Sequence, residues 1–153
     1  MINAMPITGK ARVLDIGCGA GTVSLAAAAC NSSASVTAID SHSRAVQCTR
    51  RGAQLNELGN VTAIRTDQGE IPDAGEYDLV LANPPYYADF RVAELFLEIA
   101  CRAMQPDGEL FVVAKNAAWY EENVQRWFGE YSITPSKRYI IVHGTHPHCG
   151  ALR

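Results

Sequence analysis

Short apolar runs alternate with longer amphipathic segments along the chain, and this pattern predicts strands and helices in alternation. Most of the short runs are apolar throughout, as in strands that are buried on both faces of a sheet. The predicted strands are residues 12–16, 36–40, 61–64, 77–82, 110–114, 131–134 and 139–142. The predicted helices are residues 22–30, 43–58, 91–104 and 117–128.

The order of these elements predicts an α/β fold. The first five strands are expected to run parallel, with helices covering both faces of the sheet. Only a few residues separate the last two strands, too few for a helical crossover, so these strands are expected to pair antiparallel. The sequence therefore predicts a mostly parallel sheet of about seven strands that ends in an antiparallel hairpin.

Composition and charge narrow the class of protein. The chain has 153 residues, 48% of them hydrophobic and 19% charged, which fits a single globular domain over residues 1–153. It has no apolar run of membrane-spanning length and no signal-peptide pattern at its start, so a cytoplasmic location is expected. The net charge of −3 suits a polyanion poorly unless a local basic patch exists. The candidates for such a patch, each equally typical of a solvated face, are Arg44, Arg50, Arg51 and Arg65.

A glycine-rich loop joins the first predicted strand to the first predicted helix. The run Asp15-Ile16-Gly17-Cys18-Gly19-Ala20-Gly21 permits tight turning and lets a ligand approach the backbone. Thr22 stands where a dinucleotide-binding motif would have its third glycine. Asp15 would repel a pyrophosphate but would orient an amino group, directly or through water. Both details favour S-adenosylmethionine (AdoMet) over a dinucleotide.

Two further carboxylates end the next two predicted strands. Asp40 stands where an acid accepts hydrogen bonds from ribose hydroxyls, and Asp67 is placed to accept from an adenine amino group. A lone Asp at a strand end is usually a cap or turn residue. Because the carboxyl ends of parallel strands meet at one edge of a sheet, three acids beside one glycine loop favour a ligand crevice instead.

Asn83-Pro84-Pro85-Tyr86 follows the fourth predicted strand. Each proline fixes its own φ and pushes the preceding residue toward extended backbone, so Asn83 is expected on a stiff turn. Asn and Pro are also common turn residues. At the end of this strand, however, a rigid amide, backbone carbonyls and an aromatic ring suit a planar substrate that carries an amino group.

In order and spacing, these motifs resemble those of the class I AdoMet-dependent methyltransferases, over residues 12–143. The resemblance implies a Rossmann-like sheet, a methyltransferase activity (EC 2.1.1) and AdoMet as cofactor. The N-P-P-Y motif narrows it to enzymes that methylate exocyclic or amide nitrogens. With residues 91–96 and 106–110, the chain is most similar to the small-domain ribosomal RNA guanine-N2 methyltransferases, which implies an RNA substrate.

The resemblance also implies roles for individual residues. The Asn83 side-chain oxygen and the Pro84 carbonyl would each accept one N–H of the target amine, while Tyr86 would stack on the base. No metal is implied. The implied cofactor-binding residues are Asp15, Gly17, Cys18, Gly19, Gly21, Asp40, Ser41, Asp67, Gln68 and Asn83.

Several alternatives stay open. Tyr86-Tyr87 replaces the Phe-His that often ends this motif in guanine-N2 enzymes, so adenine N6 or a protein glutamine N5 are alternative targets. A cofactor-binding but non-catalytic scaffold is the alternative from another class. The short segment before the first strand fits either a compact homologue or the catalytic part of a longer protein. The histidines within residues 143–149 match no structural zinc spacing, so a polar tail is expected there.

Overall fold

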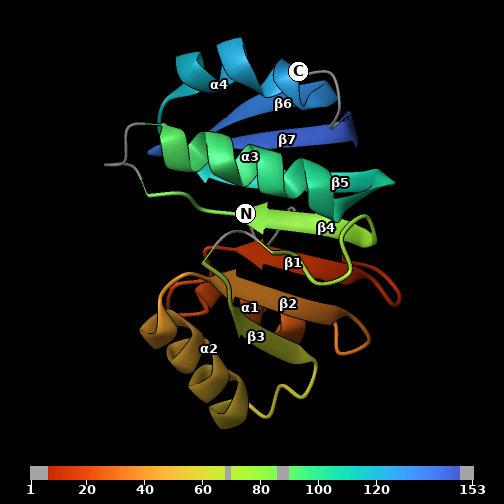
Figure 1. The fold of residues 1–153 in the computed structure, drawn as a ribbon, viewed down its shortest axis with the longest axis vertical. Helices are drawn as coiled ribbons and strands as arrows, with labels where there is room; N and C mark the ends of the chain where they lie inside the picture. The colour runs from red at the N-terminus through yellow and green to blue at the C-terminus, as the bar shows by residue number, and fades with distance from the viewer. Residues whose placement is uncertain (1–6, 68–69, 86–89, 149–153) are drawn as a thin grey trace.

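The computed structural model describes residues 7–67, 70–85 and 90–148, and seven strands in this part of the chain form one sheet. Its strand order is β3-β2-β1-β4-β5-β7-β6 (Figure 1). The strands are β1 (Arg12–Ile16), β2 (Ser35–Asp40), β3 (Val61–Arg65), β4 (Tyr77–Ala82), β5 (Met104–Ala114), β6 (Phe128–Ser136) and β7 (Tyr139–Pro147). The helices are α1 (Thr22–Cys30), α2 (Ser43–Leu55), α3 (Arg91–Ala103), α4 (Ala117–Asn123) and the 3₁₀ turn η2 (Val124–Arg126).

The pairing of the strands confirms the predicted topology. β1 lies between β2 and β4 and runs parallel to both, with Val13 opposite Val36 and Leu79. β5 runs parallel to β4, whereas β7 is antiparallel to both β5 and β6. From β1 the chain continues to β2 and β3 on one side of β1, and it then returns to form β4 on the other side of β1. In sheets of this kind the carboxyl ends of the strands at that switch point form the ligand crevice.

Helices pack against both faces of the sheet. On one face, Ala27 and Ala28 of α1 pack with Val13 and Leu81. On the other face, Leu97 and other residues of α3 pack over β1, β4 and β5, together with α4 and η2. The sheet is therefore buried on both sides at its centre, as the continuous apolar strands require. No helix in the described ranges is long and apolar enough to cross a membrane.

The C-terminal third of the chain departs most from the predicted elements. β5 begins at Met104, before the predicted start at residue 110, and its pairing with β4 shifts between Tyr77 and Leu79. The predicted end of the fourth helix is wrong, because α4 stops at Asn123 and Phe128 belongs to β6. The predicted polar tail is also wrong for residues 143–147, because β7 continues to Pro147 and lies between β5 and β6.

Candidate functional site

A cavity of about 590 Å³ opens at the carboxyl ends of β1, β2, β3 and β4. This volume is typical of small-molecule sites, which span roughly 300–1,000 Å³. The cavity thus lies at the switch point of the sheet, where the sequence predicted it. The predicted site residues that line it are Gly17, Gly19, Asp40, Ser41, Asp67 and Asn83.

The glycine loop is held between β2 and α3. Gly17 has a φ of +71°, and its N–H donates to the Ile39 carbonyl at 2.8 Å. A Cβ at Gly17 would lie only 2.6 Å from Cζ of Phe96. Gly21, at φ +84°, caps α1, and its Cβ would lie 2.8 Å from Oγ1 of Thr49. Glycine is needed at both positions because the backbone is left-handed and a neighbouring side chain is close.

Asp40 connects the glycine loop to the start of α2. One carboxylate oxygen accepts the Gly19 N–H at 3.0 Å, and the other accepts the His42 N–H at 2.8 Å. His42 is the N-cap residue of α2. An ionised carboxylate has about four acceptor positions, so two bonds leave Asp40 able to accept from a ligand. Its side chain is thereby held in one orientation at the cavity wall.

Asp15 and Cys18 support the loop from behind and do not line the cavity. The Ser24 hydroxyl donates to the buried Asp15 carboxylate. Burial raises the pKa of Asp15 to about 7. The hydrogen bonds from Ser24 lower this pKa, and the charge of nearby Asp40 raises it further. The Cys18 thiol accepts from Oγ1 of Thr49 at 3.3 Å, and burial raises its pKa to about 11. At neutral pH the thiol is therefore protonated and unreactive.

Asp67 lies at the exposed rim of the cavity and pairs with Arg65. The guanidinium Nη2 is 2.9 Å from Oδ2 of Asp67, and Nε of Arg65 also donates to the Ser41 carbonyl at 3.2 Å. These bonds connect the ends of β3 and β2. Arg50 is likewise engaged, since it donates to the Ala63 carbonyl. Two of the four arginines considered for a basic patch are thus part of the local structure.

The Asn83-Pro84-Pro85 segment forms the opposite wall of the cavity. Asn83 is exposed and lines the cavity together with Pro85, while Pro84 is buried. β4 places Asn83 directly beside the glycine loop, because Ala82 pairs with Ile16. Tyr86 and Gln68 lie outside the described residues, so their roles stay predictions.

One wall of the cavity was not anticipated from the sequence. Val92, Leu95, Phe96 and Ile99 of α3 line it. Their spacing puts them on one apolar face of the helix predicted over residues 91–104, a pattern that is equally typical of core. The available signal was position, because this helix follows the N-P-P-Y motif at the end of the fourth predicted strand. The exposed fraction of Leu95 is 45%, which fits a wall that faces a ligand rather than a closed core.

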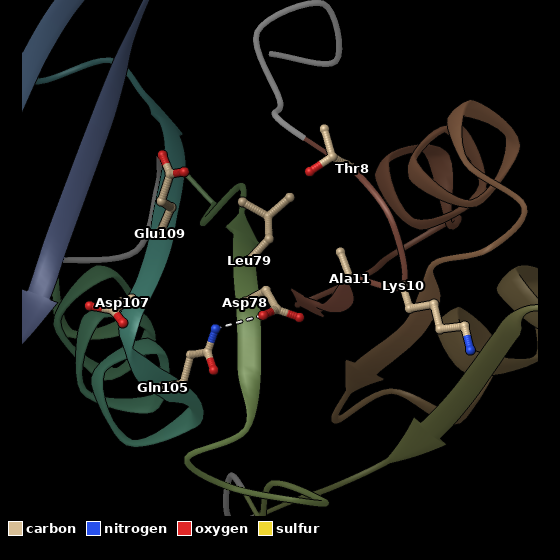
Figure 2. Close-up of a pocket in the computed structure, with 8 residues that line it drawn as sticks. All are labelled: Thr8, Lys10, Ala11, Asp78, Leu79, Gln105, Asp107 and Glu109. Carbon is tan, nitrogen blue, oxygen red and sulfur yellow. Dashed lines mark hydrogen bonds between the residues drawn. The ribbon is translucent and has the colours of Figure 1, made fainter.

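A second cavity, of about 400 Å³, lies at the opposite edge of the sheet and contains none of the predicted site residues (Figure 2). Three acids, Asp78, Asp107 and Glu109, line it together with one base, Lys10. The Asp78 carboxylate accepts from the backbone N–H of Arg12 and from Nε2 of Gln105, each at 2.6 Å. Its acidic lining suits neither a carboxylate-bearing cofactor nor a nucleic acid, so the candidate site is the cavity at the carboxyl ends.

Comparison with known proteins identifies the family of this chain. The family model described as "Methyltransferase small domain" matches residues 1–143. The chain belongs to the methyltransferase small domain family. Within the family, it is 31% identical over 150 residues to the ribosomal RNA large subunit methyltransferase G of Photobacterium profundum, covering 94% of this chain and 40% of that protein. It is 27% identical to the ribosomal RNA small subunit methyltransferase C of Marinomonas sp., covering 90% of this chain and 40% of that protein.

Solved structures show the same methyltransferase fold. A 16S rRNA N2 methyltransferase from T. thermophilus, solved with AdoMet and guanosine, superposes with a TM-score of 0.80 at 24% identity. The match covers 90% of this chain and 38% of that one. A methyltransferase from Aquifex aeolicus gives a TM-score of 0.74 at 18% identity, covering 90% of this chain and 83% of that one. This methyltransferase small domain spans about two fifths of the length of the two curated relatives named above.

Proposed function

We propose that this chain is a single AdoMet-dependent methyltransferase domain that methylates the exocyclic amine of a ribosomal RNA base, guanine N2. The observation that carries the proposal is the position of Asn83, on the wall of a cavity that also exposes Gly17, Gly19 and Asp40. The names of the curated relatives support ribosomal RNA as the substrate. The T. thermophilus relative supports guanine N2.

The residues around the cavity fit AdoMet. Nothing lies within 4 Å of a Cβ added at Gly19, and both Gly17 and Gly19 border the cavity. Asp40 presents an oriented carboxylate that suits ribose hydroxyls. The apolar α3 wall, with Phe96 beside Gly17, suits an aromatic ring or an aliphatic chain. When bound, AdoMet supplies a methyl group activated by a sulfonium.

Asn83 and Pro84 would position the nucleophile. An exocyclic amine conjugated with its ring is a weak nucleophile, so its lone pair must be oriented toward the methyl group. In the proposed mode, the Asn83 side-chain oxygen and the Pro84 carbonyl each accept one N–H of that amine. This arrangement favours a pyramidal nitrogen and stabilises the positive charge that develops on it. The proton that is then lost goes to water, so no strong general base is required.

Asn83→Ala tests the proposal. Wild-type and variant protein are incubated with AdoMet and in vitro transcribed ribosomal RNA, and the methylated nucleosides are identified by mass spectrometry. Loss of one acceptor for the transition state is expected to slow methyl transfer by about 100-fold or more. Asn56→Ala, at the exposed C-terminal end of α2, is the matched control and should keep wild-type activity.

The products distinguish the alternatives. N2-methylguanosine supports the proposal, whereas N6-methyladenosine would reassign the target base. Methylglutamine in a protein substrate would reassign the substrate class. AdoMet binding in calorimetry, without transfer to any RNA or protein, would favour a non-catalytic scaffold. An Asn83→Ala variant within a few-fold of wild type would show that the proposed role of Asn83 is wrong.

A further inference from the structure

A group of basic and aromatic side chains lies at the same edge of the sheet as the candidate site. The turn between β6 and β7 consists of Lys137 and Arg138, because Ser136 pairs with Tyr139. Lys115 follows the last residue of β5, and its Nζ lies 5.6 Å from the ring centroid of Tyr139. We call these four residues, Lys115, Lys137, Arg138 and Tyr139, the basic hairpin surface.

Strand pairing places this surface close to Asn83. Ala82, directly before Asn83, pairs with Val112 of β5, and Ala114 pairs with Ile140 of β7. Two strand spacings separate β4 from β7, which is about 10 Å across the sheet. In Figure 1, β7 begins on the side of the sheet toward which β4 runs. The hairpin surface therefore lies within reach of a polymer whose target residue is held at Asn83.

The side chains of this surface reach solvent. Lys115, Lys137, Arg138 and Tyr139 are all exposed, and Tyr139 retains 41% of its accessible area. Within the described ranges, no salt bridge involves Lys137 or Arg138. Glu121 and Glu122 of α4 lie at least one turn into that helix, and the Glu121 carbonyl accepts from the hydroxyl of Tyr131, five residues before Ser136 on β6.

The backbone of the turn is strained. Lys137 has a φ of +55°, in the left-handed region. Two-residue hairpin loops with a positive φ at their first central residue normally have glycine there. A lysine breaks this preference and places two adjacent cations at the tip. Departures of this kind from local preference are found mostly at functional sites.

The second cavity and the hairpin differ in charge. The opposite edge carries Asp78, Asp107 and Glu109 around the second cavity (Figure 2). A protein of net charge −3 binds a polyanion only where its cations are concentrated. The basic hairpin surface provides that concentration next to the site, and Tyr139 adds a ring on which a base can stack.

We infer that the basic hairpin surface binds the sugar–phosphate backbone of single-stranded RNA next to the target nucleotide, with Lys137 and Arg138 contacting phosphates. The inference rests on the proposed function, because it takes the target to be a nucleotide held at Asn83. It assigns to this chain its own contacts with the RNA outside the cavity.

The test is a charge-removing variant that also relaxes the turn. Lys137→Gly/Arg138→Asn provides the glycine that the backbone favours and removes both cations. Arg44→Gln/Arg51→Gln is the matched control, since both arginines are exposed on α2 and lie outside the hairpin. Binding of a fluorescein-labelled single-stranded RNA of mixed sequence is measured by anisotropy over a range of salt concentrations. Loss of two phosphate contacts should weaken binding and make the slope of log K against log salt shallower by about 1.4.

Each outcome decides the inference. A shallower slope for the hairpin variant, with the control unchanged and with AdoMet affinity and melting temperature retained, supports it. Equal losses in both variants, or none in the hairpin variant, would overturn it. If the wild-type protein methylates ribosomal RNA in either of those cases, the proposed function still stands and only the inference about the hairpin is overturned. A wild-type protein that binds AdoMet but neither binds nor methylates RNA overturns both proposals.

Discussion

Gly17→Ala tests the close approach between the glycine loop and α3. An alanine at a φ of +71° costs about 1–2 kcal/mol of backbone strain. Its Cβ would lie 2.6 Å from Cζ of Phe96, whereas carbon atoms in contact are about 3.5–4.0 Å apart. Phe96 is half-buried and its ring can move, so relieving the clash should add about 1 kcal/mol, at the low end for overpacking. The free energy of unfolding should fall by about 2–3 kcal/mol, measured by urea denaturation.

Gly19→Ala separates the two contributions. Gly19 is also left-handed, at φ +54°, but nothing lies within 4 Å of its added Cβ. This variant should therefore lose only the strain of about 1–2 kcal/mol. Phe96→Leu removes the ring atoms that Gly17→Ala would meet, and a double-mutant cycle should give a coupling energy of about 1 kcal/mol. Equal costs for the two glycine variants, with no coupling to Phe96, would refute the proposed constraint.

Two further predictions concern the acids around the loop. Because the native pKa of Asp15 is raised from 3.8 to about 7, the native state binds more protons than the unfolded state between these values, and stability falls as pH rises through this window. Asp15→Asn, which can still accept from Ser24, should raise the free energy of unfolding by about 2–4 kcal/mol near pH 8 and by much less near pH 4. Urea melts at both pH values check this, and a variant that is less stable near pH 8 would contradict it. Asp40→Ala removes the acceptor of the Gly19 and His42 N–H groups, so it should cost about 1–3 kcal/mol in the same melts and weaken AdoMet binding in calorimetry. Unchanged AdoMet affinity would remove Asp40 from the binding site.

The centre of the sheet was predictable because its signals are local. β1 and β4 match their predicted bounds, and each runs straight into residues that stop a strand, Gly17 after β1 and Asn83-Pro84 after β4. Convergence of the site at one edge then follows from parallel pairing. What each acid binds could not be predicted in this way. The bond from Ser24 to Asp15 and the pair between Arg65 and Asp67 depend on how side chains meet after folding.

The C-terminal third was predicted less well because its signals conflict with its environment. Pro106-Asp107-Gly108 is a strong turn sequence, yet it lies within β5 beside the shifted pairing with β4. His143 to Pro147 is polar, which suggested a tail, but β5 and β6 hold it as a strand from both sides. The His143 ring stacks on Phe111, and its Nε2 lies 2.7 Å from Oε2 of Glu109. Long-range pairing of this kind leaves no periodicity in the sequence.

The central position of β1 has a consequence for how the protein is made. β1 precedes the other described strands along the chain, yet one of its edges waits for β4, because Val13 pairs with Leu79. Pairings between residues so distant along the chain form slowly, and an uncovered strand edge invites association with other chains. During synthesis, the glycine loop emerges long before β4 and α3 close the cavity around it. A nascent chain therefore becomes able to bind its cofactor only after β4 and α3 have been translated.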